Sequence, residues 1–385
     1  MNIQSKSSND STVYMLNVIA RWFVGLLFLF SSFVKGVDPL GTAFKIEEYF
    51  SAWSGGFISF MGLMPFASFF AMLLITCEFL VGVLLITNSF RRFTAWLLVA
   101  MMIFFTFSTA LDAFSPTYGI SDCGCFGDAV KLTPLQTFLK NIVLDIPTVW
   151  ILLTWHVRSK NRFTRDSIIA IAAILAMVIF GLYNINNEPC IDFRPWKVGN
   201  RMMNTDPTLQ SESFTTYQNK QTGESVELSA KELMTRYATE PDFEQNWEWV
   251  SSRVFDPHEI YAAGFSMLDD NNNDMAVELI GSEDTLLIAT IHHIHKVDED
   301  GIIALQAAYR YASDHNYYMV MLTSALPEDV ESFSQQNGLT DVDWYYTDDK
   351  AIETMIRSNP GFIMLQDAVI LGKWHYNNIT HLTKE

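Results

Sequence analysis

The residues that most directly suggest chemistry are two cysteines separated by one glycine, Cys123 and Cys125, in the run DCGCFGD. Two thiols at this spacing can close only a small, strained disulfide ring, and strained disulfides exchange readily. A redox-active dithiol, a structural disulfide or tight turn, and a metal site are all compatible with the pair. A metal site would be incomplete, because structural zinc takes four Cys or His ligands and no second pair lies nearby.

The chain has two further cysteines, Cys77 and Cys190, either of which could exchange with this pair. Cys77 lies about eleven residues inside a hydrophobic segment, at a depth of about 16 Å. A disulfide needs Cα atoms within about 7 Å, so we expect Cys77 to be a packing residue. Cys190 lies in the polar run NNEPCIDFRPWKVG after the last hydrophobic segment. It is therefore the expected exchange partner.

Five nearly uncharged segments flank these cysteines. At about 1.5 Å per residue, four of these segments are long enough to cross a hydrocarbon core of about 30 Å. The fifth is marginal in length, and we count it as a span. The five segments cover residues 14–33, 66–87, 93–111, 134–155 and 167–183. The chain is therefore predicted to begin with an all-α transmembrane helix bundle of five spans, residues 1–183.

The loops between spans two and three and between spans four and five are basic. Their cationic residues are Arg91, Arg92, Arg158, Lys160, Arg162 and Arg165. Because basic loops stay on the cytoplasmic side, the N-terminus is expected in the cytoplasm. The loop with Cys123 and Cys125, and everything after residue 183, is then expected on the outer side.

Four ionisable side chains lie within the spans: Arg21, Glu78, Lys140 and Asp145. Arg21 and Lys140 are near span ends, so we expect them to extend to the lipid headgroups. Glu78 and Asp145 are deeper. Each either pairs with a basic residue inside the bundle or lines a proton or quinone pocket.

The negative charge of the chain belongs to its second half. Residues 1–182 carry a net charge of +2 and residues 183–385 a net charge of −20. This acidity excludes nucleic acid as a partner, because like charges repel and no basic stripe offsets them. Residues 184–261 are expected to form an irregular connection with one hairpin. Residues 262–385 alternate short strands and helices and are expected to form an α/β domain.

The five-span pattern, the run GVDPLGTAFKIEEYF and the DCGCFGD loop make residues 10–185 resemble the DoxX and MauE group of membrane proteins. The resemblance implies a bundle related in outline to vitamin K epoxide reductase, with quinone-linked or periplasmic disulfide chemistry. It implies a bacterial inner membrane, with the C-terminal region in the periplasm. A quinone near Glu78 or Asp145 is the cofactor it implies. That reductase, however, carries C-x-x-C and a second cysteine pair, which this chain lacks.

The strand and helix order of residues 262–385, with Asn359-Pro360 before the last strand pair, resembles a thioredoxin-like domain with Pro360 as its cis-proline. A catalytic thioredoxin carries C-x-x-C where this domain reads IHHIHK, so the domain cannot exchange dithiols by itself. Adjacent histidines on a strand point to opposite faces, which leaves at most His293 and His295, but not His292, on one face. We expect a solvated loop there rather than a metal site.

Through the runs IDFRPWKVG and RSNPGFIML, the whole chain resembles DoxX-like proteins of Bacteroidetes with a thioredoxin-like extension. Two functions fit. The first is a membrane thiol oxidoreductase with Cys123 and Cys125 as redox pair, Cys190 as exchange partner and a quinone as electron carrier. The alternative is a non-catalytic, membrane-anchored module that docks a periplasmic protein partner or supports an envelope complex. The missing C-x-x-C favours the alternative.

Overall fold

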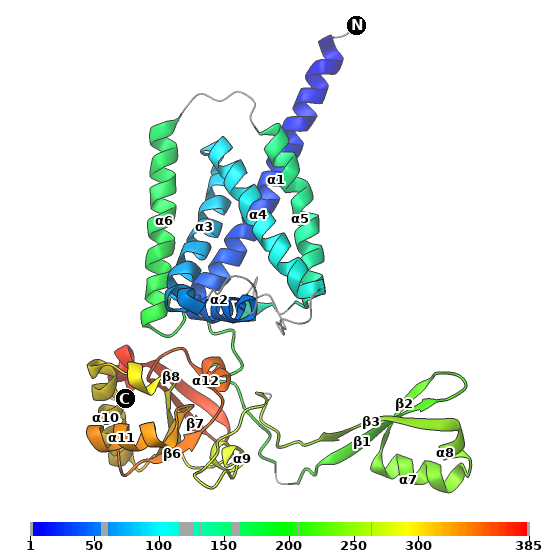
Figure 1. The fold of residues 1–385 in the computed structure, drawn as a ribbon, viewed down its shortest axis with the longest axis vertical. Coiled ribbons are helices and arrows are strands. Elements are labelled where there is room, and N and C mark those ends of the chain that lie inside the picture. Colours follow the sequence, from blue (N-terminus) through cyan, green and yellow to red (C-terminus); the bar gives the residue numbers. More distant parts are fainter. Residues whose placement is uncertain are drawn as a thin grey trace. The chain divides into compact units, whose positions relative to one another are not determined.

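The computed structural model describes residues 3–54, 61–114, 127–130, 132–155, 162–206, 208–262 and 264–382, with side chains from residue 11 onward except that of residue 128. Cys123 and Cys125 lie outside the described residues. The chain divides into two compact units, Met1–Arg194 and Pro195–Glu385 (Figure 1). The first unit is helical and the second is mixed α/β.

The helical unit is a bundle of membrane-spanning length. Its elements are α1 (Ile3–Val37), α2 (Pro39–Trp53), the 3₁₀ turn η1 (Met61–Phe66), α3 (Ala67–Thr87), α4 (Arg91–Phe114), η3 (Gly127–Ala129), α5 (Pro134–Thr154) and α6 (Phe163–Asn186). Among the described residues, five stretches are long and apolar enough to cross a membrane: Ser11–Val37, Met61–Thr87, Arg91–Phe114, Pro134–Thr154 and Phe163–Asn186. The predicted five-span bundle is confirmed, and the chain is a multi-pass membrane protein.

The helix α2 begins directly after α1 because local residues cap it. The Asp38 carboxylate accepts a hydrogen bond of 2.9 Å from the Gly41 amide, and Pro39 occupies the first helical position. In Figure 1, α2 lies across the end of the bundle at which α1 ends and α5 begins. This is the end from which α4 leads into the loop of Cys123 and Cys125.

The helices α1 and α3 pack closely through two glycines. A Cβ atom built on Gly82 would lie 2.9 Å from the carbonyl oxygen of Gly25, and one built on Gly25 would lie 3.2 Å from that of Gly82. Small residues at such contacts allow membrane helices to approach backbone to backbone. The contact fixes how α1 and α3 align along their length.

The second unit is built around a five-stranded sheet in the order β6-β5-β4-β7-β8. Its strands are β4 (Leu286–Ile291), β5 (Tyr318–Thr323), β6 (Asp343–Tyr346), β7 (Gly361–Gln366) and β8 (Val369–His375). The helices of this unit outside the three-stranded sheet are α9 (Ala276–Ile280), α10 (Glu299–His315), α11 (Pro327–Asn337), α12 (Asp349–Met355) and α13 (Ile379–Leu382). Two 3₁₀ turns, η4 (Ile294–Lys296) and η5 (Tyr376–Asn378), complete it. β4, β5 and β6 are parallel, whereas β7 and β8 form a hairpin in which β7 runs antiparallel to β4.

Alternate residues of β4 supply two apolar cores. Leu286 and Ile288 pack into one core, and Leu287 and Ala289 into the other, because successive side chains of a strand point to opposite faces. The peptide bond before Pro360 is cis and leads into β7. The predicted α/β domain of thioredoxin-like topology is confirmed.

The region expected to be an irregular connection contains a second sheet. Its three antiparallel strands, in the order β2-β1-β3, are β1 (Glu212–Asn219), β2 (Ser225–Ser229) and β3 (Trp247–Phe255), and two helices, α7 (Ala230–Thr239) and α8 (Phe243–Asn246), lie between β2 and β3. The hairpin of β1 and β2 is where the sequence predicted it. The sequence gives little sign of β3 because nearly all its residues are exposed, so no hydrophobic alternation marks it.

The core of the α/β unit also begins earlier than predicted. Trp196, Met202 and Met203 are buried in the same apolar cluster as Ile288. The predicted boundary at residue 262 therefore falls inside this unit, and the structure divides the chain after Arg194.

Candidate functional site

A buried ion pair lies inside the bundle between α1 and α3. Lys35 Nζ is 2.5 Å from Glu78 Oε1, and the two side chains are 6% and 2% exposed. Ser31 Oγ donates a 3.0 Å hydrogen bond to Glu78 Oε2. Helical side chains lean toward the N-terminus, which lets Lys35 reach back along α1 to the level of Ser31. Of the two alternatives for Glu78, the structure contains the pairing with a basic residue.

Polar side chains continue from this pair along the facing surfaces of α4 and α5. Thr106 Oγ1 donates to Asp145 Oδ2 at 3.0 Å, and Asn141 Nδ2 donates to Thr109 Oγ1 at 3.1 Å. Asn141 and Thr109 are buried, whereas Asp145 is only half-buried. Lys140 lies within electrostatic range of Lys35 and Glu78.

Asp112 is a buried carboxylate that sequence reasoning missed. It lies in the last turn of α4, directly before the loop of Cys123 and Cys125, and Tyr49 of α2 donates a 2.5 Å hydrogen bond to its Oδ2. A carboxylate at the end of a span, next to a cysteine pair, was the signal that could have identified it.

Arg21 does not extend to the headgroups as predicted. Its side chain is buried and donates from Nη1 to Asn88 Oδ1 at 2.7 Å. Trp155 Nε1 donates to the same oxygen at 2.7 Å, and the guanidinium lies 5.2 Å from the centre of the Trp155 ring. A polar acceptor and an aromatic face inside the bundle stabilise the guanidinium at this position.

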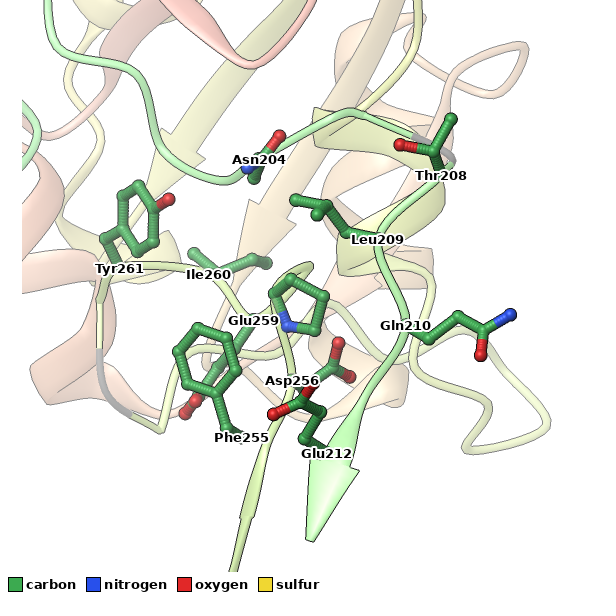
Figure 2. A pocket seen from close by; sticks show the side chains of 11 residues that line it. Asn204, Thr208, Leu209, Gln210, Glu212, Phe255, Asp256, Glu259, Ile260 and Tyr261 are labelled. Atoms are coloured by element: carbon green, nitrogen blue, oxygen red, sulfur yellow. The ribbon is translucent and has the colours of Figure 1, made fainter. Parts of the chain in front are cut away.

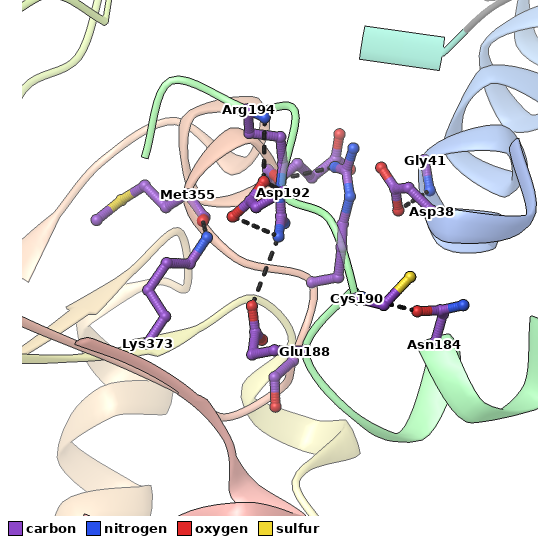
Figure 3. Close-up of polar contacts among 12 residues, drawn as sticks. Asp38, Gly41, Asn184, Glu188, Cys190, Asp192, Arg194, Met355 and Lys373 are labelled. Carbon is purple, nitrogen blue, oxygen red and sulfur yellow. Dashed lines mark hydrogen bonds and ion pairs between the residues drawn. The ribbon is translucent and has the colours of Figure 1, made fainter. Parts of the chain in front are cut away.

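Cys190 is an exposed free cysteine whose backbone is fixed to the bundle (Figure 3). Its amide donates a 3.0 Å hydrogen bond to Asn184 Oδ1. Asn184 is buried, and its Nδ2 donates to the carbonyl oxygen of Gly36 at 3.1 Å and to that of Phe180 at 2.9 Å. One asparagine therefore ties the segment of Cys190 to the last turn of α1.

Arg194 forms ion pairs with acidic residues on both sides of Cys190. Its Nε is 2.8 Å from Asp192 Oδ1, and its Nη2 is 3.6 Å from Glu188 Oε2. Burial opposes the charge of Arg194, but the carboxylates of Asp192, Asp38 and Glu188 outweigh it and raise its pKa above the ordinary value. The segment is therefore a closed turn that faces the N-terminus of α2.

The chain that follows the cysteine pair contacts the same turn of α1. Gly127 follows Cys125 by two residues and lies in η3, which contacts α1. A Cβ atom built on Gly127 would be 3.4 Å from Val34 Cγ1. The segment of Cys190 and the residue at the end of the Cys123/Cys125 loop thus meet α1 within residues 34–36, around the Lys35–Glu78 pair. Cys77 packs beside the apolar cluster of the bundle.

In the α/β unit, the three histidines after β4 have three different environments. His292 is buried, with Nδ1 3.0 Å from Asp349 Oδ1, so the solvated loop predicted here is wrong for this residue. The main chain of His293 exchanges hydrogen bonds of 3.2 and 3.0 Å with the side chain of Asn359, next to cis-Pro360. His295 is exposed. The hydrogen bond with His292 holds the pKa of Asp349 below its usual value.

A pocket lies where the three-stranded sheet joins the rest of the unit (Figure 2). It has a cavity volume of about 810 Å³. The lining is partly apolar and partly acidic: Asn204, Thr208, Leu209, Gln210, Glu212, Phe255, Asp256, Pro257, Glu259, Ile260 and Tyr261. Three of these residues are carboxylates: Glu212, Asp256 and Glu259.

His258 holds two sides of this pocket together. Its Nδ1 is 2.8 Å from the carbonyl oxygen of Asn204, and its Nε2 is 3.3 Å from that of Leu209. Because carbonyl oxygens only accept, the imidazolium alone satisfies both contacts. The bond to Asn204, with smaller contributions from Leu209, Asp256 and Asp206, raises the pKa of His258 despite desolvation.

The stability that His258 contributes should therefore be complete below its ordinary pKa of about 6.5 and be lost as the pH rises through the raised value. We expect limited proteolysis of residues 204–206 and 208–210 to accelerate as the pH rises above about 6.5. A His258→Gln variant should be cleaved at the faster rate throughout, whereas His381→Gln should behave as wild type. Equal pH dependence in His258→Gln and wild type would contradict this role.

Residues 13–154 match the family of the methylamine utilisation protein MauE. Protein TlpB of Flavobacterium psychrophilum is 23% identical over 240 residues, which cover 60% of this chain and 59% of that protein. The chain thus matches less than two thirds of that relative's length. A thiol peroxidase from Chromobacterium violaceum is 18% identical, with a TM-score of 0.25, over 31% of this chain and 82% of its own. Residues 13–154 form a MauE family domain, to which this chain joins an α/β domain of thioredoxin-like topology.

Proposed function

We propose that this protein is a membrane thiol oxidoreductase in which Cys123 and Cys125 form the redox pair and Cys190 is the exchange partner. One observation carries the proposal: the segment of Cys190 and the residue that ends the Cys123/Cys125 loop contact the same turn of α1. Two segments about 60 residues apart in the chain are thereby held at one end of the bundle. Cys190 is exposed there, as an exchanging thiol must be.

The exchange can be written as a balanced sequence. The Cys190 thiolate attacks the Cys123–Cys125 disulfide, which releases one thiolate of the pair and forms a mixed disulfide. A thiolate of a substrate dithiol then attacks the sulfur of Cys190 and releases the second thiolate of the pair. The other substrate thiolate attacks next and leaves a substrate disulfide and free Cys190. Two electrons have moved from the substrate to Cys123 and Cys125.

A quinone is the proposed acceptor of these electrons. The dithiol gives two electrons and two protons to the quinone, which becomes a quinol while the disulfide re-forms. The buried Lys35–Glu78 pair, with Asp145 along the same polar surface, supports a site for the quinone headgroup here. Ionisable groups inside a membrane are costly, so those that are present usually have a function. Asp145, which is only half-buried, would contact the quinone, and the enclosed Lys35–Glu78 pair would supply fixed charges near it.

The proposal also places this end of the bundle in the periplasm of a bacterial inner membrane. Arg91, Arg92, Arg162 and Arg165 lie at the opposite end of the spans, between α3 and α4 and between α5 and α6. Basic loops favour the cytoplasmic side. The cysteines and the α/β unit would then lie in an oxidising compartment, where disulfides persist.

Differential thiol alkylation in cells tests the proposal. When quinol reoxidation is blocked, Cys123 and Cys125 should accumulate as thiols in the wild type. Cys190→Ser should keep the pair oxidised under the same block, because the substrate can no longer reach it, and Cys77→Ser should behave as wild type. If the pair stays in one state under all conditions, and the variants Cys123→Ser, Cys125→Ser and Cys190→Ser keep full function, the enzyme proposal fails.

A docking role is the second candidate, and the acidic pocket favours it. The α/β unit contains no cysteine, and three carboxylates line its pocket. Such a surface fits a basic segment of a protein partner. A redox-silent pair in the alkylation experiment would leave this function as the better account of the chain.

A further inference from the structure

Three potential metal ligands converge where β4 meets α12. His292 directly follows β4, Asp349 is the first residue of α12, and Glu353 lies one turn later on that helix. Residues four apart share one face of a helix, so both carboxylates point the same way. One ligand atom from each of these three side chains lies within 4.8 Å of the other two.

Two of the ligands are already held near coordination distance. His292 Nδ1 is 3.0 Å from Asp349 Oδ1, and Ser324 Oγ donates to that oxygen at 3.0 Å and to the carbonyl oxygen of His292 at 3.2 Å. Two ligands about 2.0–2.1 Å from a tetrahedral zinc ion are about 3.4 Å apart. An ion could therefore replace the hydrogen bond between His292 and Asp349 with little movement, while the Glu353 carboxylate would move closer to these two ligands by up to about 1.4 Å.

Burial and access suit a bound cation. The His292 side chain is 4% exposed, whereas that of Asp349 is 43% exposed, so an ion can arrive from the solvent on the side of α12. One imidazole and two carboxylates supply the nitrogen and oxygen donors that zinc and neighbouring first-row divalent ions accept. Three protein ligands would leave a further position for water.

We propose that His292, Asp349 and Glu353 bind a divalent first-row metal ion, with Zn²⁺ as the best match. The site lies after the strand at which a thioredoxin-like domain carries its cysteines, and in this chain it would join β4 to α12. It is independent of the thiol chemistry of Cys123, Cys125 and Cys190.

The test uses the full chain in detergent with all four cysteines replaced by serine, so that thiolates cannot bind the probe. Zn²⁺ should raise the Tm of this parent protein. Co²⁺ should give visible bands without a thiolate charge-transfer band. Glu353→Gln, which keeps the contact between His292 and Asp349, should weaken Zn²⁺ binding by at least about 10-fold. His292→Phe should abolish binding.

Glu328→Gln, an exposed carboxylate on α11, is the matched control and should bind Zn²⁺ as the parent does. The proposal is overturned if the parent binds no Zn²⁺ or Co²⁺ at micromolar concentrations, or if Glu353→Gln binds as tightly as Glu328→Gln. The Glu353→Gln comparison decides the question even if His292→Phe fails to fold.

Discussion

Glu78→Gln should destabilise the helical bundle by about 3–5 kcal/mol, because Lys35 would remain as a buried cation without its counter-ion. The pair is almost fully enclosed, so neither water nor lipid headgroups can take over from the carboxylate. The free energy of unfolding can be measured by titrating the protein with SDS in mixed micelles. A smaller loss would mean that Lys35 finds another acceptor.

The matched control is Glu48→Gln, which removes the carboxylate from the Lys45–Glu48 pair of α2. That pair is 2.7 Å long but partly exposed, so the cost should be below about 1 kcal/mol. The double variant Lys35→Met/Glu78→Gln should recover most of the stability lost in Glu78→Gln, because no charge is left buried. If the double variant recovers its fold but not its quinone-dependent thiol cycling, the pair has a role beyond structure. Equal costs for Glu78→Gln and Glu48→Gln would contradict the prediction.

Asn184→Leu should uncouple Cys190 from the bundle. Leucine keeps the branching and the number of heavy atoms but cannot accept from the Cys190 amide or donate to the Gly36 carbonyl. These two groups therefore lose their partner, at a cost of about 1–3 kcal/mol. The larger effect should be kinetic. The effective concentration of Cys190 at the thiol pair falls once its segment is released, and exchange should slow by about 10-fold or more.

The measurement is the rate at which a Cys190–Cys123 disulfide forms in a Cys125→Ser background when added diamide takes up the two electrons and two protons of the two thiols, followed by mass spectrometry. Asn186→Leu is the control, because the Asn186 side chain donates to Leu182 in its own helix. It should leave the rate unchanged. An unchanged rate in Asn184→Leu would show that the tie to Gly36 does not position Cys190.

The sequence predicted features that depend on local patterns. Uncharged stretches revealed the five spans, and alternating short strands and helices, with Pro360 among them, revealed the thioredoxin-like order. Each of these signals is contained within about 20 residues, the length over which hydrophobic periodicity is expressed. Such patterns define an element but not its neighbours.

Pairings across long separations could not be read in this way. Arg21 bonds with Asn88, and His292 with Asp349, across 67 and 57 residues. A polar residue with a distant partner has the same local sequence as one without a partner, which is why Arg21 was predicted to extend to the lipid headgroups and His292 to lie in a solvated loop. The same limit applies to Asn184, whose link to Gly36 spans 148 residues.

The contact between Gly25 and Gly82 has an evolutionary consequence. Because the two backbones nearly touch, one added methyl group at either position would push the helices apart and change the level at which α1 meets α3. The level of that meeting decides whether Lys35 reaches Glu78, although neither glycine touches the pair. Substitutions of lipid-facing residues on the two helices should therefore be tolerated, whereas a larger side chain at Gly25 or at Gly82 should be selected against.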